Sequence, residues 1–179
     1  MTNPSPWLLR WPQALRPDAS ALDLACGSGR HLRTLAALGM RVTGVDRDAA
    51  ALAPLYGLAE IIHADIEAGP WPLAGRQFDL VLVTNYLWRP LLPQIVASLA
   101  PGGWLIYETF ALGQQSIGRP ANPAFLLQPG ELLNTCAGLR IVAFEDGMDE
   151  NVAGPRYVQR IAAVRELPQD GVYQRYLLG

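Results

Sequence analysis

Apolar runs alternate with helix-like patterns along most of this chain. Apolar residues that recur every three or four positions predict helices, and short continuous apolar runs predict strands. The runs that predict strands are 21–26, 41–46, 59–65, 78–84, 104–110, 139–145 and 156–165, and the patterns that predict helices are 30–38, 48–56, 91–100 and 130–137. Strands that alternate with helices of about ten residues predict an α/β fold with a mostly parallel sheet covered on both faces.

Two segments lack this periodicity. Residues 1–20 contain four prolines and form an N-terminal segment with room for one short helix around 7–15. Residues 111–129 contain three more prolines and show no period. Because long irregular segments of compact domains are often functional loops, we expect 111–129 to be a substrate loop. The length of 179 residues predicts a single domain over 1–179.

Composition narrows the class of protein. Hydrophobic residues make up 50% of the chain and charged residues 17%, which excludes an intrinsically disordered protein. The net charge is −2 and all fourteen basic residues are arginines without a run, so a nucleic-acid partner is disfavoured. Two cysteines, Cys26 and Cys136, predict neither a metal site nor a disulfide framework. No span or leader pattern is visible, so we expect a cytoplasmic protein without membrane contact.

A glycine-containing loop follows the first predicted strand. The stretch 22–30 reads Leu-Asp-Leu-Ala-Cys-Gly-Ser-Gly-Arg, and Gly27 and Gly29 allow the backbone to turn tightly and approach a ligand. A simple strand-to-helix turn is the competing interpretation. A dinucleotide fingerprint is disfavoured because Leu32 stands where a small residue is needed and Asp23 would repel a pyrophosphate. A triphosphate loop is excluded because the chain has no lysine.

Two more acidic residues end the second and third predicted strands. Asp46 lies 17 residues after Gly29, close to the offset of roughly 20 residues at which an acid accepts hydrogen bonds from ribose hydroxyls. Its alternative role is to cap the next helix, for which Asp48 competes. Asp65 can accept a hydrogen bond from an exocyclic amine while Ile66 packs on an aromatic base. Together with Asp23, these acids favour a cationic ligand with a ribose and an amine-bearing base.

These motifs resemble those of class I S-adenosylmethionine-dependent methyltransferases, in the small bacterial type related to tellurite-resistance and thiopurine methyltransferases. The matching stretches are 22–30, Val45-Asp46, Ala64-Asp65-Ile66, Phe78-Asp79-Leu80-Val81 and Leu99-Ala100-Pro101-Gly102-Gly103. The resemblance is strongest over 21–108. It implies a Rossmann-like, doubly wound, seven-stranded and mostly parallel sheet with an antiparallel final strand. Ala25 departs from the family pattern, in which many members have glycine.

The resemblance also implies roles for individual residues. Asp23 would serve the amino-acid end of S-adenosylmethionine, Asp46 its ribose, and Asp65 with Ile66 its adenine. The expected cofactor-binding residues are Asp23, Ala25, Cys26, Gly27, Gly29, Arg30, Asp46, Arg47, Asp65, Ile66, Asn85 and Tyr86. His31 could also touch the cofactor, whereas His63 is expected to be a packed strand residue.

Methyl transfer from a sulfonium needs alignment and exclusion of water rather than a catalytic triad. The catalytic residue is left open, with Asn85, Tyr86, Glu108 and Arg119 as candidates, and Tyr107, Asn122 and Phe125 as further substrate contacts. An equal alternative makes Arg89 and Arg119 surface ion-pair partners. Asn85 and Tyr86 are not followed by the double proline of amino-methyltransferases, which disfavours methylation of a base.

A small-molecule acceptor is therefore the favoured substrate. The alternatives are a cofactor-binding sensor or subunit without turnover, a methyltransferase for RNA or protein, and a nicotinamide-dependent oxidoreductase. The sequence leaves the acceptor atom and the oligomeric state open.

Overall fold

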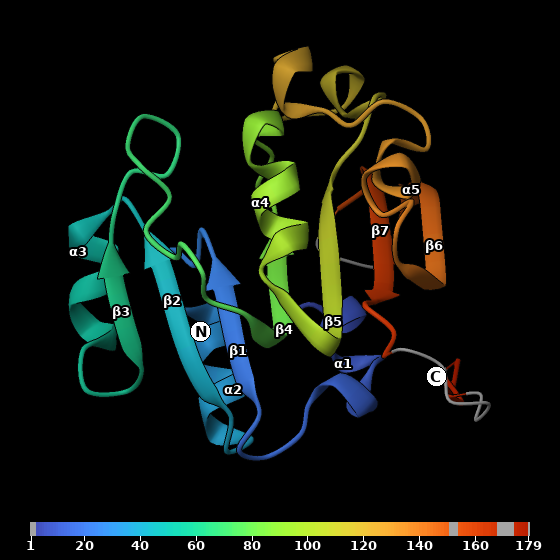
Figure 1. Ribbon diagram of the computed structural model, residues 1–179. Coiled ribbons are helices and arrows are strands. Elements are labelled where there is room, and N and C mark those ends of the chain that lie inside the picture. The colour runs from blue at the N-terminus through green and yellow to red at the C-terminus, as the bar shows by residue number, and fades with distance from the viewer. Residues whose placement is uncertain (1–2, 151–153, 168–173, 179) are drawn as a thin grey trace.

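A seven-stranded sheet forms the centre of the molecule (Figure 1). The computed structural model describes residues 3–150, 154–167 and 174–178. The sheet has the order β3-β2-β1-β4-β5-β7-β6, in which the first five strands are parallel and β7 runs antiparallel to both of its neighbours. The strands are β1 (Ser20–Leu24), β2 (Arg41–Asp46), β3 (Glu60–His63), β4 (Phe78–Thr84), β5 (Leu99–Phe110), β6 (Arg140–Asp149) and β7 (Arg156–Val164). The expected doubly wound sheet with an antiparallel final strand is confirmed.

Helices cover both faces of this sheet. They are α1 (Pro6–Leu9), α2 (Arg30–Ala37), α3 (Ala49–Leu52), α4 (Leu92–Ala97) and α5 (Glu131–Thr135). Apolar residues of α4 and α5 pack in one core cluster on one face, and those of α1, α2 and α3 pack in a second cluster on the other. No helix among the described residues is long and apolar enough to cross a membrane.

Several expected helices are shorter in the structure. The helix expected at 48–56 ends at Leu52 and continues only as a 3-10 turn, Ala53–Leu55, since Pro54 has no N–H to donate. The helix expected at 7–15 is divided in the same way into α1 and a 3-10 turn that begins at Pro12.

The predicted end of the helix expected at 91–100 was also wrong. Helix α4 ends at Ala97, and the hydroxyl of Ser98 donates to the carbonyl of Gln94. Leu99 then pairs with Phe78, so the Pro-Gly-Gly stretch lies inside β5. Residues 111–129 are irregular as expected, apart from the 3-10 turns Gln114–Ser116 and Pro123–Phe125.

Candidate active site

Parallel pairing brings the predicted site residues to one edge of the sheet. Leu24 is paired with Val45, and Asp46 with His63, so the ends of β1, β2 and β3 lie side by side. The end of β4 is next to β1 on the other side. The carboxyl edge of a doubly wound sheet is where such folds bind ligands.

The end of β2 is bonded to the glycine loop. Asp46 accepts hydrogen bonds from the N–H of Gly27 on one carboxylate oxygen, at 2.7 Å, and from the N–H of Asp48 on the other, at 2.9 Å. Asp48 itself caps α3 by accepting from Ala50 and Ala51. The alternative role of Asp46 as the helix cap is therefore wrong, and its carboxylate lies at the glycine loop.

The two glycines of the loop have different surroundings. Both adopt left-handed backbone angles, with φ of +52° at Gly27 and +75° at Gly29. A Cβ on Gly29 would lie 2.5 Å from the side chain of Leu55, whereas a Cβ on Gly27 would meet no atom within 4 Å. The absence of a side chain at Gly29 thus permits close packing against Leu55, whereas the space beside Gly27 is open. Ala25 is also left-handed, with φ of 54°, where the family pattern has glycine.

A hollow of about 160 Å³ lies over the ends of β2 and β3. It is lined by Ala25, Asp46, Arg47, Ala64, Asp65, Ile66, Glu67 and Tyr86. Ile66 is buried in its wall, and one oxygen of Asp65 accepts from the N–H groups of Ala68 and Glu67, which lowers the pKa of that carboxyl. This hollow has the apolar wall and the acceptor oxygens that an adenosine group needs.

Asp23 is the buried acid of the site. Its side chain is 1% exposed, and Oδ2 has no hydrogen-bond partner among the described residues. Burial raises the pKa of Asp23 to about 7, while a hydrogen bond from the backbone of Leu32 and the charge of Arg30 oppose that rise. A buried carboxylate with a free oxygen fits a cationic group, such as the ammonium or sulfonium of S-adenosylmethionine. Burial also raises the pKa of Cys26 to about 12, so this loop cysteine stays a thiol.

The turn after β4 presents the next two candidates. Asn85 is exposed and left-handed, with φ of 54°, and its N–H donates to the carbonyl of Glu108 at 2.9 Å. Tyr86 lines the hollow, and its buried hydroxyl has no partner among the described residues. Its carbonyl accepts from the hydroxyl of Tyr107 at 2.9 Å. Tyr107 is fully buried, so the prediction that it contacts substrate was wrong.

The other two catalytic candidates lie in very different surroundings. Glu108 is 2% exposed and is held by the hydroxyl of Ser5 at 3.0 Å and by Arg160 at 2.6 Å. Its carboxylate therefore belongs to a buried polar network. Arg119 is exposed on the loop 111–129, and its guanidinium forms no hydrogen bond or ion pair with the residues that the structure describes.

Arg89 forms an ion pair, as the alternative interpretation of the sequence predicted. It pairs with Glu131 at 2.7 Å and donates to the carbonyls of Ala124 and Leu126 in the loop 111–129. His63 was expected to be packed in a strand. It is instead exposed, because it lies on the edge strand β3, and its Nε2 lies 3.0 Å from the carbonyl oxygen of Arg47.

Sequence reasoning missed Ser5 altogether and left His31 undecided. Both side chains are buried, and the N–H of Ser5 donates to Nε2 of His31 at 3.1 Å. The Ser5-Pro6 pair is typical of a helix start, and Ser5 does cap α1. No local pattern could have shown its longer-range contacts.

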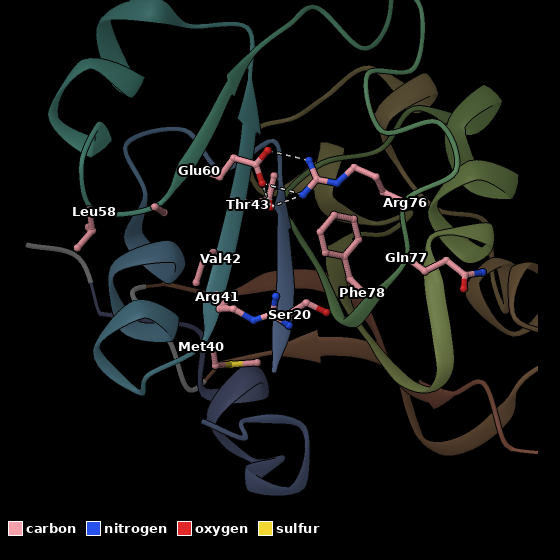
Figure 2. A pocket seen from close by; sticks show the side chains of 11 residues that line it. Ser20, Met40, Arg41, Val42, Thr43, Leu58, Glu60, Arg76, Gln77 and Phe78 are labelled. Carbon is pink, nitrogen blue, oxygen red and sulfur yellow. Dashed lines mark hydrogen bonds and ion pairs between the residues drawn. The ribbon is translucent and has the colours of Figure 1, made fainter. Parts of the chain in front are cut away.

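A larger hollow, of about 490 Å³, lies at the opposite edge of the sheet (Figure 2). Arg76 crosses it and donates to Glu60 at 2.7 Å and to Thr43 at 3.1 Å. These polar groups bond to one another, and the hollow lies at the amino ends of the strands, away from the glycine loop.

Comparison with known proteins finds similarity to methyltransferases. A family model described as a methyltransferase domain matches residues 21–103. The chain is 37% identical to trans-aconitate 2-methyltransferase of Paracidovorax citrulli over 105 residues, which are 52% of this chain and 40% of that protein. It is 32% identical to a ubiquinone biosynthesis O-methyltransferase of Burkholderia thailandensis over 118 residues, 59% of this chain and 51% of that protein. The chain spans about half the length of these relatives or less.

Solved structures share the fold. TehB from Haemophilus influenzae superposes with a TM-score of 0.67 at 22% identity, covering 84% of this chain and 58% of TehB. An S-adenosylmethionine-dependent methyltransferase from Methanosarcina mazei superposes with a TM-score of 0.69 at 19% identity, covering 93% of this chain and all of that one. The resemblance found in the sequence is thus confirmed: residues 21–103 match a methyltransferase domain, and the chain shares its fold with a solved S-adenosylmethionine-dependent methyltransferase.

Proposed function

We propose that this protein transfers a methyl group from S-adenosylmethionine to a small-molecule acceptor. The observation that carries the proposal is the joining of Asp46 to the N–H of Gly27, beside the buried carboxylate of Asp23. This arrangement offers acids to the ribose and to the cationic end of one ligand along one open loop. The relatives named for trans-aconitate and for ubiquinone biosynthesis support an acceptor of small size.

Each end of the cofactor would meet its own residues. Asp46 would accept hydrogen bonds from the ribose hydroxyls, Asp65 from the adenine amine, and Ile66 would pack on the base. Asp23 would balance the charge of the amino-acid end, with Gly27, Gly29 and Arg30 beside it. When bound, S-adenosylmethionine supplies a methyl group already activated on a sulfonium.

The acceptor would approach from the ends of β4 and β5. The protein's task there is to align an acceptor atom with the methyl group and to exclude water. Asn85 and Tyr86 follow β4, Tyr86 also lines the hollow, and Arg119 provides an exposed cation on the loop 111–129. We propose that Asn85, Tyr86 and Arg119 contact the acceptor. Glu108 would instead support the site from within its buried polar network.

Transfer of a tritiated methyl group tests this function. The protein is incubated with labelled S-adenosylmethionine and either a small-metabolite extract, RNA or a protein extract from cells. Label in the metabolite fraction alone is expected. Exclusive labelling of RNA or protein would overturn the small-molecule acceptor.

A binding protein without turnover is the second candidate. Ala25 favours it, because a methyl group stands in the loop where the family pattern has glycine. Formation of S-adenosylhomocysteine with any acceptor pool removes this candidate, while tight cofactor binding with no product in every pool would favour it.

A further inference from the structure

Ser5 joins three elements at the carboxyl edge of the sheet. Its N–H donates to Nε2 of His31 on α2 at 3.1 Å, and its hydroxyl donates to Glu108 on β5 at 3.0 Å. The same hydroxyl oxygen accepts from the N–H of Trp7 at 3.1 Å, which caps α1. Ser5 is 4% exposed, so these bonds form away from competing water.

His31 is neutral and accepts the hydrogen bond that joins it to Ser5. Because Nε2 accepts from Ser5, the ring proton lies on Nδ1, which is 3.3 Å from the hydroxyl of Thr84 at the end of β4. Burial lowers the pKa of His31 to about 4, and the charge of Arg30 lowers it further. The ring is therefore neutral near pH 7 and keeps accepting from Ser5.

This junction lies at the carboxyl edge of the sheet, on the β4–β5 side of the adenosine hollow. The hollow is over β2 and β3, whereas the junction involves the ends of β4 and β5 in the order β3-β2-β1-β4-β5. His31 follows the glycine loop by two residues, and the carbonyl of Glu108 accepts from the N–H of Asn85. Under the proposed function, this is where the methionine part of the cofactor lies.

We propose that Ser5 is a positioning residue that pins the N-terminal segment (residues 3–9) across the methionine end of the site and gates exchange of the cofactor. The inference rests on the proposed function. Trp7 and Leu8 are anchored in the core, and the indole N–H of Trp7 donates to the carbonyl of Ile161 at 3.3 Å. Opening therefore needs only the Ser5 end of the segment to move.

A gate and a direct contact affect the kinetics of binding differently. A gate limits association and dissociation equally, so its removal speeds both and leaves the dissociation constant unchanged. A direct contact to the ligand would change mainly the dissociation rate. Loss of stability alone would change neither rate constant. The two rate constants together therefore separate these roles.

The test measures both rate constants for S-adenosylhomocysteine by surface plasmon resonance on the immobilised full chain. Ser5→Ala removes the bonds to Glu108 and Trp7, and we expect both rate constants to rise about tenfold with the dissociation constant within about twofold of wild type. Ser5→Thr keeps the hydroxyl and is expected to restore the wild-type rates. Ser98→Ala is the matched control, because Ser98 is equally buried, donates to Gln94 and lies at the other edge of the sheet.

The outcomes separate this inference from the proposed function. Rates of Ser5→Ala that equal those of Ser98→Ala would overturn the gate while the proposed function stands. An increase in the dissociation rate alone would also overturn it, because Ser5 would then be a direct contact. If the wild-type chain did not bind S-adenosylhomocysteine, the proposed function would fail, and the gate with it.

Discussion

Asp46 accepts a 2.7 Å hydrogen bond from the backbone N–H of Gly27, which ties the end of β2 to the loop after β1. Its second carboxylate oxygen is bonded to the N–H of Asp48. The acid that the sequence assigns to a ribose therefore also fixes the loop that would hold the rest of the cofactor. Neighbouring strands supply the two partners, so the sheet sets the shape of the site.

Replacing Asp46 should weaken cofactor binding far more than replacing its neighbour Asp48. Asp46→Ala is expected to reduce the affinity for S-adenosylmethionine by about 1–3 kcal/mol, because hydrogen bonds to the ribose and to the loop are lost. Asp48→Ala should instead cost about 1 kcal/mol of stability through loss of the α3 cap, with unchanged affinity. Titration calorimetry and thermal unfolding of both variants check this. Equal affinities of the two variants would contradict the placement of the ribose.

The left-handed backbone at Ala25 predicts an unusual gain from glycine. A left-handed conformation costs an L-residue about 1–2 kcal/mol, while glycine loses about 0.4–1 kcal/mol through the entropy of the unfolded chain. Ala25→Gly should therefore raise the free energy of unfolding by up to about 1.6 kcal/mol. Ala36→Gly inside α2 should lower it by about 1 kcal/mol. Denaturant unfolding that showed the same loss for both variants would refute strain at Ala25.

Asp23 should make the cofactor-free protein lose stability as the pH rises. Its pKa of about 7 lies above the ordinary value of 3.8, so its contribution is fully present below pH 3.8 and is lost as the pH rises through 7. Asp23→Asn has no such titration. Between pH 5 and pH 8, the melting temperature of the wild type is thus expected to fall relative to that of Asp23→Asn. Parallel curves for the two proteins would show that Asp23 does not titrate in this range.

Cofactor binding should release a proton from the same group. A cation placed beside Asp23 lowers its pKa, so about half a proton is expected to leave at pH 7. Calorimetric titration with S-adenosylmethionine in two buffers of different ionisation enthalpy measures this number. The Asp23→Asn variant should release none, and an equal release from both proteins would assign the proton to another group.

Arg89 should hold the loop 111–129 in place. It bonds to Glu131 and to two carbonyls of the segment 124–126, so Arg89→Met is expected to speed amide hydrogen exchange in 122–128 about tenfold or more. The matched control is Arg76→Met, which breaks a similar pair with Glu60 at the other edge of the sheet (Figure 2). Mass spectrometry of exchange should show no change in 122–128 for that control. Unchanged exchange in Arg89→Met would contradict the role of Arg89 in holding this loop.

Most of the strands could be predicted because each contains a short apolar run bounded by turn residues, although β5 begins earlier and β6 ends later than its run. The helices were predicted too long where a local pattern competed with prolines or with a distant partner. Leu99 continues the helical period of α4, but its pairing with Phe78 makes it the first residue of β5. A periodicity along the chain carries no information about a partner on another strand, so it cannot predict this pairing.

The candidate site, too, could be predicted from the sequence only in part. Asp23, Asp46 and Asp65 could be predicted because parallel strands end at a common edge, so position in a strand implies position in space. The contacts of Ser5 span 26 residues to His31 and 103 residues to Glu108. Only the packing of α1 on the sheet brings these residues together, and no sequence pattern encodes it.

Isothermal titration of the full chain with S-adenosylmethionine and S-adenosylhomocysteine tests the central claim most directly, with a nicotinamide dinucleotide as control. We expect both adenosyl ligands to bind with micromolar affinity and the dinucleotide not to bind. Binding of neither adenosyl ligand, or preference for the dinucleotide, would contradict the assignment of the glycine loop and its three acids to S-adenosylmethionine.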